Sequence, residues 1–450
     1  MFNIFSNQSS SSQKEFQLGN LSSTERVIYW AIILTPVWWL LGIQPLFYPA
    51  VVIVLFIIAF DIDQVIQESF PVCVWAWLAM AIAMLWSSIL GLYSLGFPLQ
   101  QTAAGAVTFL KSYFFIFACL ALPFWTQLRV QVITRAVAWM ATSYLISTCI
   151  QMLLLAVGVH NAIYTPFIAR LLPGEKSSFL IILASVQNFF GIPFPRTVLY
   201  TPDPPILGIC SILCFFICLG ETNRRLRNWA LAGSLCGLLV SFSRIAWICL
   251  PLAIVLIICF RSSLIHQAYL WLVSLTFFIC SLFGLTVRDL LNKPLEIFDK
   301  ARPNSSAERA LVVSKTFEAW QEKPWLGWGI VRGSAHLYED VYVDLASFST
   351  YAAVLYLHGI IGFIFFLLAL LSTLFSFYAS AIRGDTFSQR AFACLSVLYL
   401  QMNATPLSWM AVFLWFFFLW LGAVLQAIDH NHLVLNSWEQ LSDMAIRNDS

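Results

Sequence analysis

The sequence predicts an all-α polytopic membrane protein with about twelve transmembrane helices and a large periplasmic loop between the ninth and tenth. Three observations predict this fold class. The chain of 450 residues is 60% hydrophobic and only 10% charged. Its mean hydropathy is +0.82. Apolar runs recur at about the length that a helix needs to cross a bilayer, and a helix satisfies its own backbone hydrogen bonds in lipid.

The predicted spans follow one another along the whole chain. An even number of them puts both termini on the same side of the membrane. The spans cover approximately residues 27–43, 45–60, 71–90, 105–122, 132–157, 205–220, 229–242, 245–260, 268–286, 351–378, 391–403 and 408–427.

The spans and the polar segments between them divide the chain into seven parts. A short apolar piece at 179–190 is too short to span alone, so we expect it to lie in the interface or to be re-entrant. The parts are a flexible cytoplasmic tail (1–26), an N-terminal transmembrane bundle (27–157), a periplasmic or interfacial segment (158–204), central transmembrane helices (205–286), a large periplasmic loop (287–350), C-terminal transmembrane helices (351–427) and a cytoplasmic tail (428–450).

Basic residues in short loops set the predicted orientation. The segment ETNRRLRN (221–228) and the loops with Arg129, Arg135, Arg383 and Arg390 all fall on one side of the twelve-span path. Short loops rich in Lys and Arg stay in the cytoplasm. We therefore expect a multi-pass membrane protein with both termini cytoplasmic. The two outer segments are also basic, which suggests an anionic substrate.

The sequence offers little sign of a metal, a cofactor or nucleic acid as a partner. All 11 cysteines fall within apolar runs without a CxxC pair, which is typical of packing residues. Asp61-Ile62-Asp63 resembles the D-x-D of metal-dependent membrane glycosyltransferases, but the topology puts it in a cytoplasmic turn. His430-Asn431-His432 is interpreted as part of a surface tail. We predict no metal, no cofactor and no nucleic-acid partner.

Arg244 is the only charged residue in LLVSFSRIAWICLPL (238–252). The topology places it in the tight turn between the spans 229–242 and 245–260, at the outer membrane boundary. Two interpretations remain. Arg244 snorkels to lipid phosphates as an anchor, or it is a fixed cation for a bound phosphate group, for which a guanidinium offers a planar pair of donors.

A second candidate cation, Arg309, lies in the large loop. The segment 305–324 predicts a helix that begins with a Ser305–Glu308 capping box and ends before Pro324. Arg309 falls in its first turn, where the helix dipole mildly disfavours a cation. Either the neighbouring Glu308 or a bound anion would offset this. The predicted apolar stripe of the helix is Ala310, Val313, Phe317 and Trp320.

Three sequence stretches together resemble the bacterial O-antigen ligase and polysaccharide polymerase superfamily. They are SFSRIA, AERALVVSKTFEAWQEKPWLGWG and SFSTYAAVLYLHGIIG. The family has about twelve spans in a GT-C-like arrangement, an S-x-S-R hairpin and an R…W…P-x-x-G-x-G stretch in a late periplasmic loop. FPRTVLYTPDPPILG (194–208) is similar to the family's Arg- and Pro-rich stretch, which adds Arg196 to the candidates.

The resemblance implies an inverting, metal-independent glycosyltransferase. A glycan on undecaprenyl diphosphate is transferred to an acceptor hydroxyl at the periplasmic face. Arg244 and Arg309 would hold the diphosphate and stabilise it as it leaves, and Arg196 would assist in binding it. The implied partners are the lipid-linked glycan, the bilayer and other polysaccharide export proteins.

The sequence departs from the family at one position. A His is expected just before the tenth span, where this chain has Phe348. His336 is the nearest substitute for the general base, because a His with an ordinary pKa of about 6.5 suits that role. A solvated loop His is the alternative. Three carboxylates follow it, and His358 inside the tenth span is a further candidate or a packed core residue. The carboxylates are Glu339, Asp340 and Asp344.

Several functions fit this sequence. The first is polymerisation of O-antigen or exopolysaccharide repeats. The alternatives are an O-antigen ligase that acts on a lipid A core in lipopolysaccharide biosynthesis or on a protein, a small-anion transporter, and a non-catalytic member of a polysaccharide export assembly. Transporters place ionisable groups near the membrane midplane. Charged residues within the predicted spans are almost absent here, with Lys111 as the main exception. This favours the enzyme over the transporter.

Overall fold

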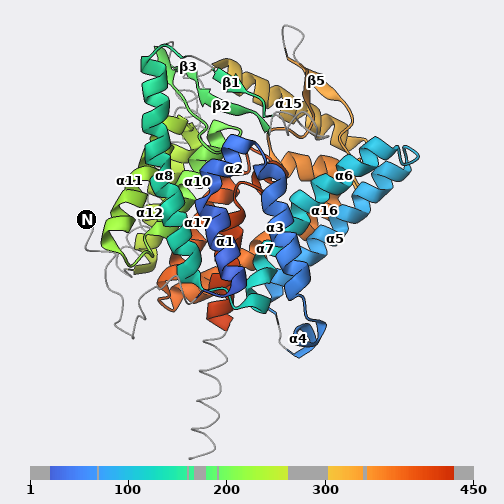
Figure 1. The fold of residues 1–450 in the computed structure, drawn as a ribbon. Helices are drawn as coiled ribbons and strands as arrows, with labels where there is room; N and C mark the ends of the chain where they lie inside the picture. Colours follow the sequence, from blue (N-terminus) through green and yellow to red (C-terminus); the bar gives the residue numbers. More distant parts are fainter. Residues whose placement is uncertain are drawn as a thin grey trace, which may run out of the picture.

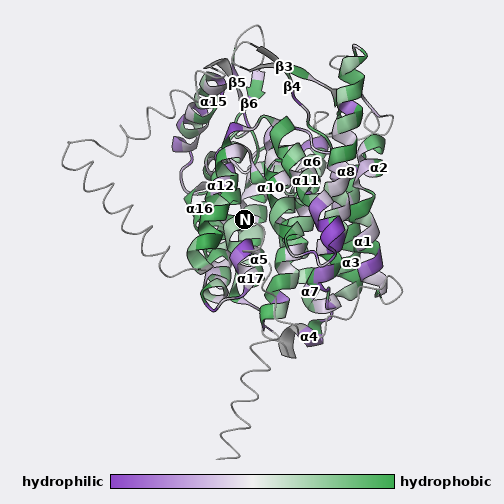
Figure 2. Ribbon diagram, turned by 90° about the vertical axis from the view of Figure 1, so that its left-hand side faces the viewer, coloured by the Kyte–Doolittle hydropathy of each residue, from purple (hydrophilic) through white to green (hydrophobic). Residues whose placement is uncertain are grey.

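The computed structural model describes residues 21–67, 70–159, 162–166, 179–189, 192–261, 303–337 and 342–429. In these residues the chain forms a bundle of mostly apolar helices (Figures 1 and 2). Strands β1 to β6 and helix α15 gather at one end of the bundle, which we call the loop end, and α4 lies at the other end (Figure 1). The predicted span 268–286 and both chain termini lie outside the described residues.

The N-terminal half of the bundle is broken into more helices than predicted. The expected span 105–122 is two helices that meet at Ser112, whose hydroxyl donates to the Thr108 carbonyl at 2.6 Å. The expected span 27–43 likewise divides at Leu34. The helices are α1 (Ser23–Ile33), α2 (Thr35–Leu41), α3 (Gln44–Ala59), α4 (Ile62–Gln67), α5 (Val72–Tyr93), α6 (Leu99–Lys111), α7 (Tyr113–Thr126) and α8 (Val130–Ala156).

The central and C-terminal helices lie close to their predicted positions. The basic segment 221–228, expected to be a loop, instead contributes the first turn of α11, because the Asn223 side chain caps the N–H groups of Arg225 and Leu226. The helices are α10 (Pro204–Cys218), α11 (Arg224–Ser241), α12 (Arg244–Arg261), α15 (Pro303–Gln321), α16 (Thr350–Ile382), α17 (Thr386–Gln401), α18 (Leu407–Met410) and Trp415–Asp429.

The described helices are typical of a membrane protein in length and composition. Four segments are long and apolar enough to cross a bilayer: Val72–Tyr93, Leu99–Thr126, Val130–Ala156 and Thr350–Ile382. Shorter apolar helices accompany them at Gln44–Ala59, Pro204–Cys218, Arg244–Phe260 and Trp415–Asp429. The protein is therefore a mostly helical membrane protein, and the number of about twelve spans stays a prediction.

Short strands are the part of the fold that the all-α prediction omits. The piece 179–190 contributes two of them, β2 and β3, so its apolar residues pair in hairpins at the loop end. All three pairs are antiparallel and two-stranded: β1 (Ala162–Tyr164) with β2 (Ile181–Ala184), β3 (Val186–Phe189) with β4 (Ile192–Pro195), and β5 (Ser334–His336) with β6 (Tyr342–Asp344).

The core of the bundle lies around α10, which is buried along almost its whole length. Small residues let the helices approach closely there, as in other membrane bundles. A Cβ on Gly233 of α11 would lie 2.0 Å from the Ala141 carbonyl oxygen of α8. The ten cysteines among the described residues are all free, in agreement with their predicted role in packing.

Two ion pairs join helices at the end of the bundle opposite the loop end. Arg129 contacts Glu25 at 2.7 Å, and Arg135 contacts Glu221 at 2.6 Å. Gly220 lies beside the Arg390 guanidinium, since a Cβ there would be 3.0 Å from it. The structure thus brings these basic segments to one end of the bundle, as the sequence predicts. Which side of the membrane that end faces stays a prediction.

The large loop is anchored in a break of α16. Gly359 has φ of 64° and ψ of −168°, which interrupts the helix. The P-x-x-G-x-G stretch of the large loop, Pro324–Gly329, fills the break with its own backbone. The hydrogen bonds run from the N–H of Trp328 to the C=O of Tyr356 (2.9 Å), from Gly329 to Leu357 (2.7 Å), from Ile360 to Pro324 (2.8 Å) and from Ile361 to Trp325 (3.2 Å).

Glycine is required on both sides of this junction. A Cβ on Gly359 would lie 2.3 Å from the Trp325 backbone, and one on Gly329 would lie 2.2 Å from the Ser87 carbonyl oxygen of α5. Both glycines also have a positive φ, which other residues rarely adopt. The glycines of this motif therefore fix the large loop against α5 and α16.

Candidate functional site

The three arginines that the sequence singles out line one pocket, which we call the arginine pocket. It contains about 400 Å³ of space, open solvent included. Arg196 comes from the segment before α10, Arg244 from the start of α12 and Arg309 from α15. Among the residues that the structure describes, none that lines this pocket is acidic. The lining residues are Arg196, Pro205, Phe242, Ser243, Arg244, Ile245, Arg309, Gln401 and Ala404.

The SFSR turn shapes one wall of the pocket. The buried Ser241 hydroxyl donates to the Leu238 carbonyl at 2.7 Å and accepts the Ser243 N–H at 3.2 Å. Phe242 has φ of 47°, a left-handed conformation that is costly for an aromatic residue. α12 then begins at once with Arg244. The turn is thus as tight as the sequence predicts, and it sets the Arg244 backbone at the pocket.

The Arg244 side chain reaches across to the large loop. It is half-buried, and its Nη2 donates to the Ser306 hydroxyl of α15 at 3.1 Å. An arginine that only snorkels to lipid headgroups would extend away from the protein. The observed contact instead favours the interpretation of Arg244 as a fixed cation inside a pocket.

Arg196 is fixed against the same turn. Its Nε donates to the Ser241 carbonyl at 3.0 Å, and its N–H donates to the Ser185 carbonyl at 2.9 Å. The next residue, Thr197, donates its N–H to the Val240 carbonyl at 3.1 Å. The segment 194–208 and the SFSR turn belong to different motifs in the sequence. In the structure they are therefore held together by hydrogen bonds.

Helices α10 and α12 approach each other closely beside the arginine pocket. A Cβ on Gly208 would lie 2.7 Å from the Ala246 Cβ and 2.9 Å from the Ser243 Cβ. Carbon atoms in ordinary contact are about 3.5–4.0 Å apart. A side chain at Gly208 would therefore push the start of α12, and Arg244 with it, away from α10.

Helix α15 begins earlier in the sequence than predicted. It begins at Pro303, because proline suits the first helical position, where no N–H is needed. Ser305 is therefore inside the helix rather than its N-cap, and Arg309 lies in the second turn rather than the first.

The predicted apolar stripe of α15 is right only in part: Trp320 packs against a buried cluster and Val313 is half-buried. Val312 and Thr316 are 0% and 1% exposed, whereas Phe317 is 37% exposed. A buried threonine was not expected in the stripe. Its hydroxyl donates to the Val312 carbonyl at 2.7 Å and accepts the Ala346 N–H at 3.1 Å, so burial leaves it satisfied.

Phe348 lies beside the pocket. The Arg309 guanidinium carbon is 5.3 Å from the centre of the Phe348 ring, within the range of a cation–π contact. The position where the family's His is expected is thus next to a pocket arginine. In this chain that position supplies an aromatic face for the cation and no group that accepts a proton.

The other predicted candidates that the structure describes do not line the arginine pocket. His336 is exposed on β5, with its ring 5.0 Å from that of Tyr342. Asp344 is exposed on β6, while Glu339 and Asp340 lie outside the described residues. His358 is buried in α16, where its ring contacts the Ser87 hydroxyl of α5. His358 therefore has the surroundings of a packed core residue.

The D-x-D of Asp61 and Asp63 lies at the start of α4, at the end of the bundle opposite α15 (Figure 1). The Asp61 side chain accepts the Asp63 N–H at 2.9 Å and so caps a turn. In the part of the chain that the structure describes, no three His, Cys, Asp or Glu side chains are grouped as metal ligands would be.

Gln401 is a pocket residue that the sequence analysis did not single out. It is the last residue of α17 and is 0% exposed. An available signal was its position: it is a polar residue at the end of the apolar run 391–403. That signal is weak in a sequence, since helix ends are commonly polar.

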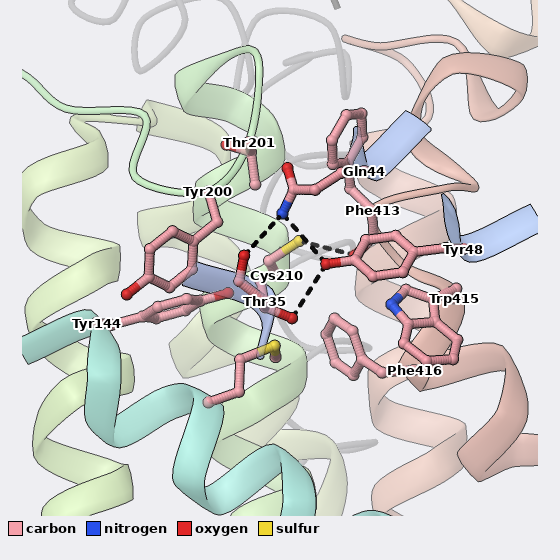
Figure 3. A pocket seen from close by; sticks show the side chains of 11 residues that line it. Thr35, Gln44, Tyr48, Tyr144, Tyr200, Thr201, Cys210, Phe413, Trp415 and Phe416 are labelled. Atoms are coloured by element: carbon pink, nitrogen blue, oxygen red, sulfur yellow. Dashed lines mark hydrogen bonds between the residues drawn. The ribbon is translucent and has the colours of Figure 1, made fainter. Parts of the chain in front are cut away.

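A second pocket, the aromatic pocket, lies among the helices (Figure 3). Gln44, Tyr48 and Thr35 are joined there by hydrogen bonds of 3.1 to 3.5 Å, and Tyr48 stacks on Trp415 at 4.8 Å. The residues that line it are Thr35, Gln44, Tyr48, Met140, Tyr144, Tyr200, Thr201, Cys210, Phe413, Trp415 and Phe416. None of these described residues is charged, and they come from both the N-terminal and the C-terminal parts of the bundle.

Comparison with known proteins agrees with the site. Residues 229–367 match the family model described as O-antigen ligase. A comparison with curated proteins finds no match. The matched region contains Arg244, Arg309 and Phe348, whereas Arg196 and Gln401 lie outside it. The match places residues 229–367 in the O-antigen ligase and polysaccharide polymerase superfamily, the family that the sequence motifs resemble.

Proposed function

We propose that this protein is a glycosyltransferase that polymerises O-antigen or exopolysaccharide repeats at the periplasmic face of the bacterial inner membrane. Its donor would be a glycan on undecaprenyl diphosphate, and its acceptor a hydroxyl of a second lipid-linked repeat. The family match supports an activity of the ligase and polymerase type in general. The finer assignment rests on the arginine pocket.

The observation that supports the proposal most is the convergence of Arg196, Arg244 and Arg309 on one pocket. Several guanidinium groups in one pocket attract an anion more strongly than a single one does. A lipid-borne diphosphate has the charge and the oxygen atoms that guanidinium groups bind well.

Two helix ends add to the positive potential. α12 begins at Arg244, and α10 begins at Pro204, next to Pro205 of the pocket. The N-terminal end of a helix has a partial positive charge that stabilises nearby anions. Both dipoles would favour a diphosphate in the arginine pocket, which is the leaving group of the proposed reaction.

The proposed reaction breaks the bond between the anomeric carbon and the diphosphate oxygen. The acceptor hydroxyl oxygen forms the new bond from the opposite face, so the anomeric configuration inverts. The electron pair of the broken bond remains on undecaprenyl diphosphate. Arg244 and Arg309 would stabilise this developing charge, in a role that hydrogen-bond donors and cations fill in other transfer reactions.

The group that takes the hydroxyl proton is a separate proposal. His336 belongs to the same large loop, but it is exposed and does not line the arginine pocket. Phe348 lies nearer the pocket and accepts no proton. We keep His336 as the candidate base, and the variant His336→Ala tests it: loss of transfer with retained donor binding is the expected result.

The structure gives less support to an anion transporter. Transporters bind ions at broken helices near the membrane midplane, where free backbone groups meet the ion. α16 is broken at Gly359, but the backbone of Pro324–Gly329 already satisfies the groups on both sides of the break. The pocket arginines lie instead at helix ends and in the large loop.

The proposal is tested in a strain that lacks this gene and is complemented with variants. Arg244→Ala and Arg309→Ala are compared with the wild type by gel profile of surface and secreted polysaccharide. We expect single repeats to accumulate on the lipid carrier and long chains to be lost. Long chains that remain on the carrier would instead identify a ligase. An unchanged profile would refute the glycan assignment and favour anion transport.

A matched control is Arg225→Ala. Arg225 is exposed on the first turn of α11, at the end of that helix away from the SFSR turn. The variant removes one positive charge from the α11–α12 hairpin, and Arg225 does not line the arginine pocket. We expect a normal profile, with membrane abundance of all variants checked by immunoblot.

A further inference from the structure

A buried amide in the arginine pocket has one atom that no group among the described residues satisfies. Gln401 is 0% exposed and lines the pocket. Its Nε2 donates to the Pro205 carbonyl at 3.4 Å, and its Oε1 has no hydrogen-bond partner among the described residues. A buried acceptor without a donor destabilises the folded protein. A ligand with a donor would remove this cost.

The orientation of the amide follows from its neighbour. Pro205 has no N–H, so its backbone offers only a carbonyl oxygen to the amide. The amide nitrogen must face that oxygen, because two acceptors would repel. The amide oxygen is therefore the atom left for a ligand, and it requires a hydroxyl or an N–H.

We propose that the Gln401 Oε1 accepts a hydrogen bond from a hydroxyl of the sugar that is joined directly to the diphosphate. This inference rests on the proposed function. The guanidinium groups of the pocket are donors and suit phosphate oxygens, whereas Gln401 supplies the acceptor that a sugar hydroxyl needs. A sugar phosphate contains both kinds of group within a few ångströms. Gln401 thus distinguishes a glycan-bearing lipid from the bare lipid diphosphate released after transfer.

The test compares two probes on the purified full-length protein in lipid nanodiscs. One is undecaprenyl diphosphate, and the other is the lipid-linked glycan extracted from the strain that lacks this gene. For Gln401→Met we expect affinity for the lipid-linked glycan to fall about three- to tenfold, the usual effect of one hydrogen bond. Affinity for undecaprenyl diphosphate should stay within about twofold.

The same helix provides a control. Gln389 of α17 is 3% exposed, and its Oε1 also has no partner among the described residues, but it does not line the pocket. Gln389→Met should leave both affinities unchanged. If Gln401→Met lowers thermal stability more than Gln389→Met, then Gln401→Asn, which keeps the amide but shortens its reach, should show the same selective loss.

The outcomes separate this inference from the function on which it rests. An equal loss for both probes, or no loss for either, would overturn the role of Gln401 while undecaprenyl diphosphate still binds the wild type. If no lipid-linked glycan accumulates in the deletion strain, or the wild type binds neither probe, the proposed function itself fails and the inference falls with it.

Discussion

Replacement of Gly208 by alanine tests whether the contact between α10 and α12 sets the position of Arg244. The added Cβ would lie 2.7 Å from the Ala246 Cβ and 2.9 Å from the Ser243 Cβ. Ordinary carbon contacts are about 3.5–4.0 Å, so the start of α12 must move by about 1 Å. A misplacement of about 1 Å in a catalytic group can lower a rate by about 100-fold.

The effect on stability should be smaller than the effect on rate. Overpacking of a core typically costs about 1–3 kcal/mol, and the change from glycine to alanine within a helix returns about 0.5–1 kcal/mol. We therefore expect the purified variant to fold with a modestly lower Tm. Its rate of glycan transfer per molecule, measured with lipid-linked glycan from the deletion strain, should fall by about 100-fold.

Two further variants sharpen this test. In Gly105→Ala of α6 the added Cβ would lie 3.6 Å from a Leu92 methyl carbon, an ordinary contact, so rate and Tm should both be normal. Combining Gly208→Ala with Ala246→Gly removes the shorter contact and should restore part of the rate. A Gly208→Ala variant with the wild-type rate would refute the reasoning, since Arg244 would then tolerate the displacement.

Three other perturbations have expected outcomes. Phe348→Leu removes the aromatic face 5.3 Å from a pocket guanidinium, a contact worth about 0.5–1 kcal/mol. Binding of undecaprenyl diphosphate should therefore weaken two- to fivefold, and Phe348→Tyr should bind it as the wild type does. Equal binding by both variants would contradict the role of the contact. Burial raises the pKa of Glu25, but hydrogen bonds from Arg129 and from backbone N–H groups outweigh this effect, so the pKa lies below its ordinary value. Because the pKa in the folded protein is lowered, this carboxylate contributes stability above its unfolded pKa and loses it as the pH falls through the folded pKa. The Tm of the wild type should therefore fall more steeply below pH 4.5 than that of Glu25→Gln, and parallel curves would exclude the effect. Gly329→Ala combines a φ of 74° with a Cβ 2.2 Å from a backbone oxygen, whereas Gly333→Ala has a φ of 97° and only a contact of 3.7 Å. Gly329→Ala should therefore lower the Tm far more than Gly333→Ala. Similar Tm values for the two variants would show that the junction at α16 is not tight.

The sequence by itself determined those features that depend on neighbouring residues. Apolar runs of bilayer length identified the helices, because the cost of placing polar groups in lipid is a local property of each segment. The SFSR turn between α11 and α12 followed from the break between two such runs. Arg244 and Arg309 stood out as charges in motifs, and the same motifs indicated the family that residues 229–367 match.

Only the tertiary structure decided how these parts meet. Arg196 and Arg309 are more than 100 positions apart, and no local pattern specifies that both face Arg244 in one pocket. The face of α15 that is buried includes Thr316, and the Ala346 N–H of a distant segment satisfies its hydroxyl there. Gln401 became a candidate only when its amide oxygen was seen in the pocket. Each of these features depends on contacts between distant segments, and those contacts arise only when the helices pack.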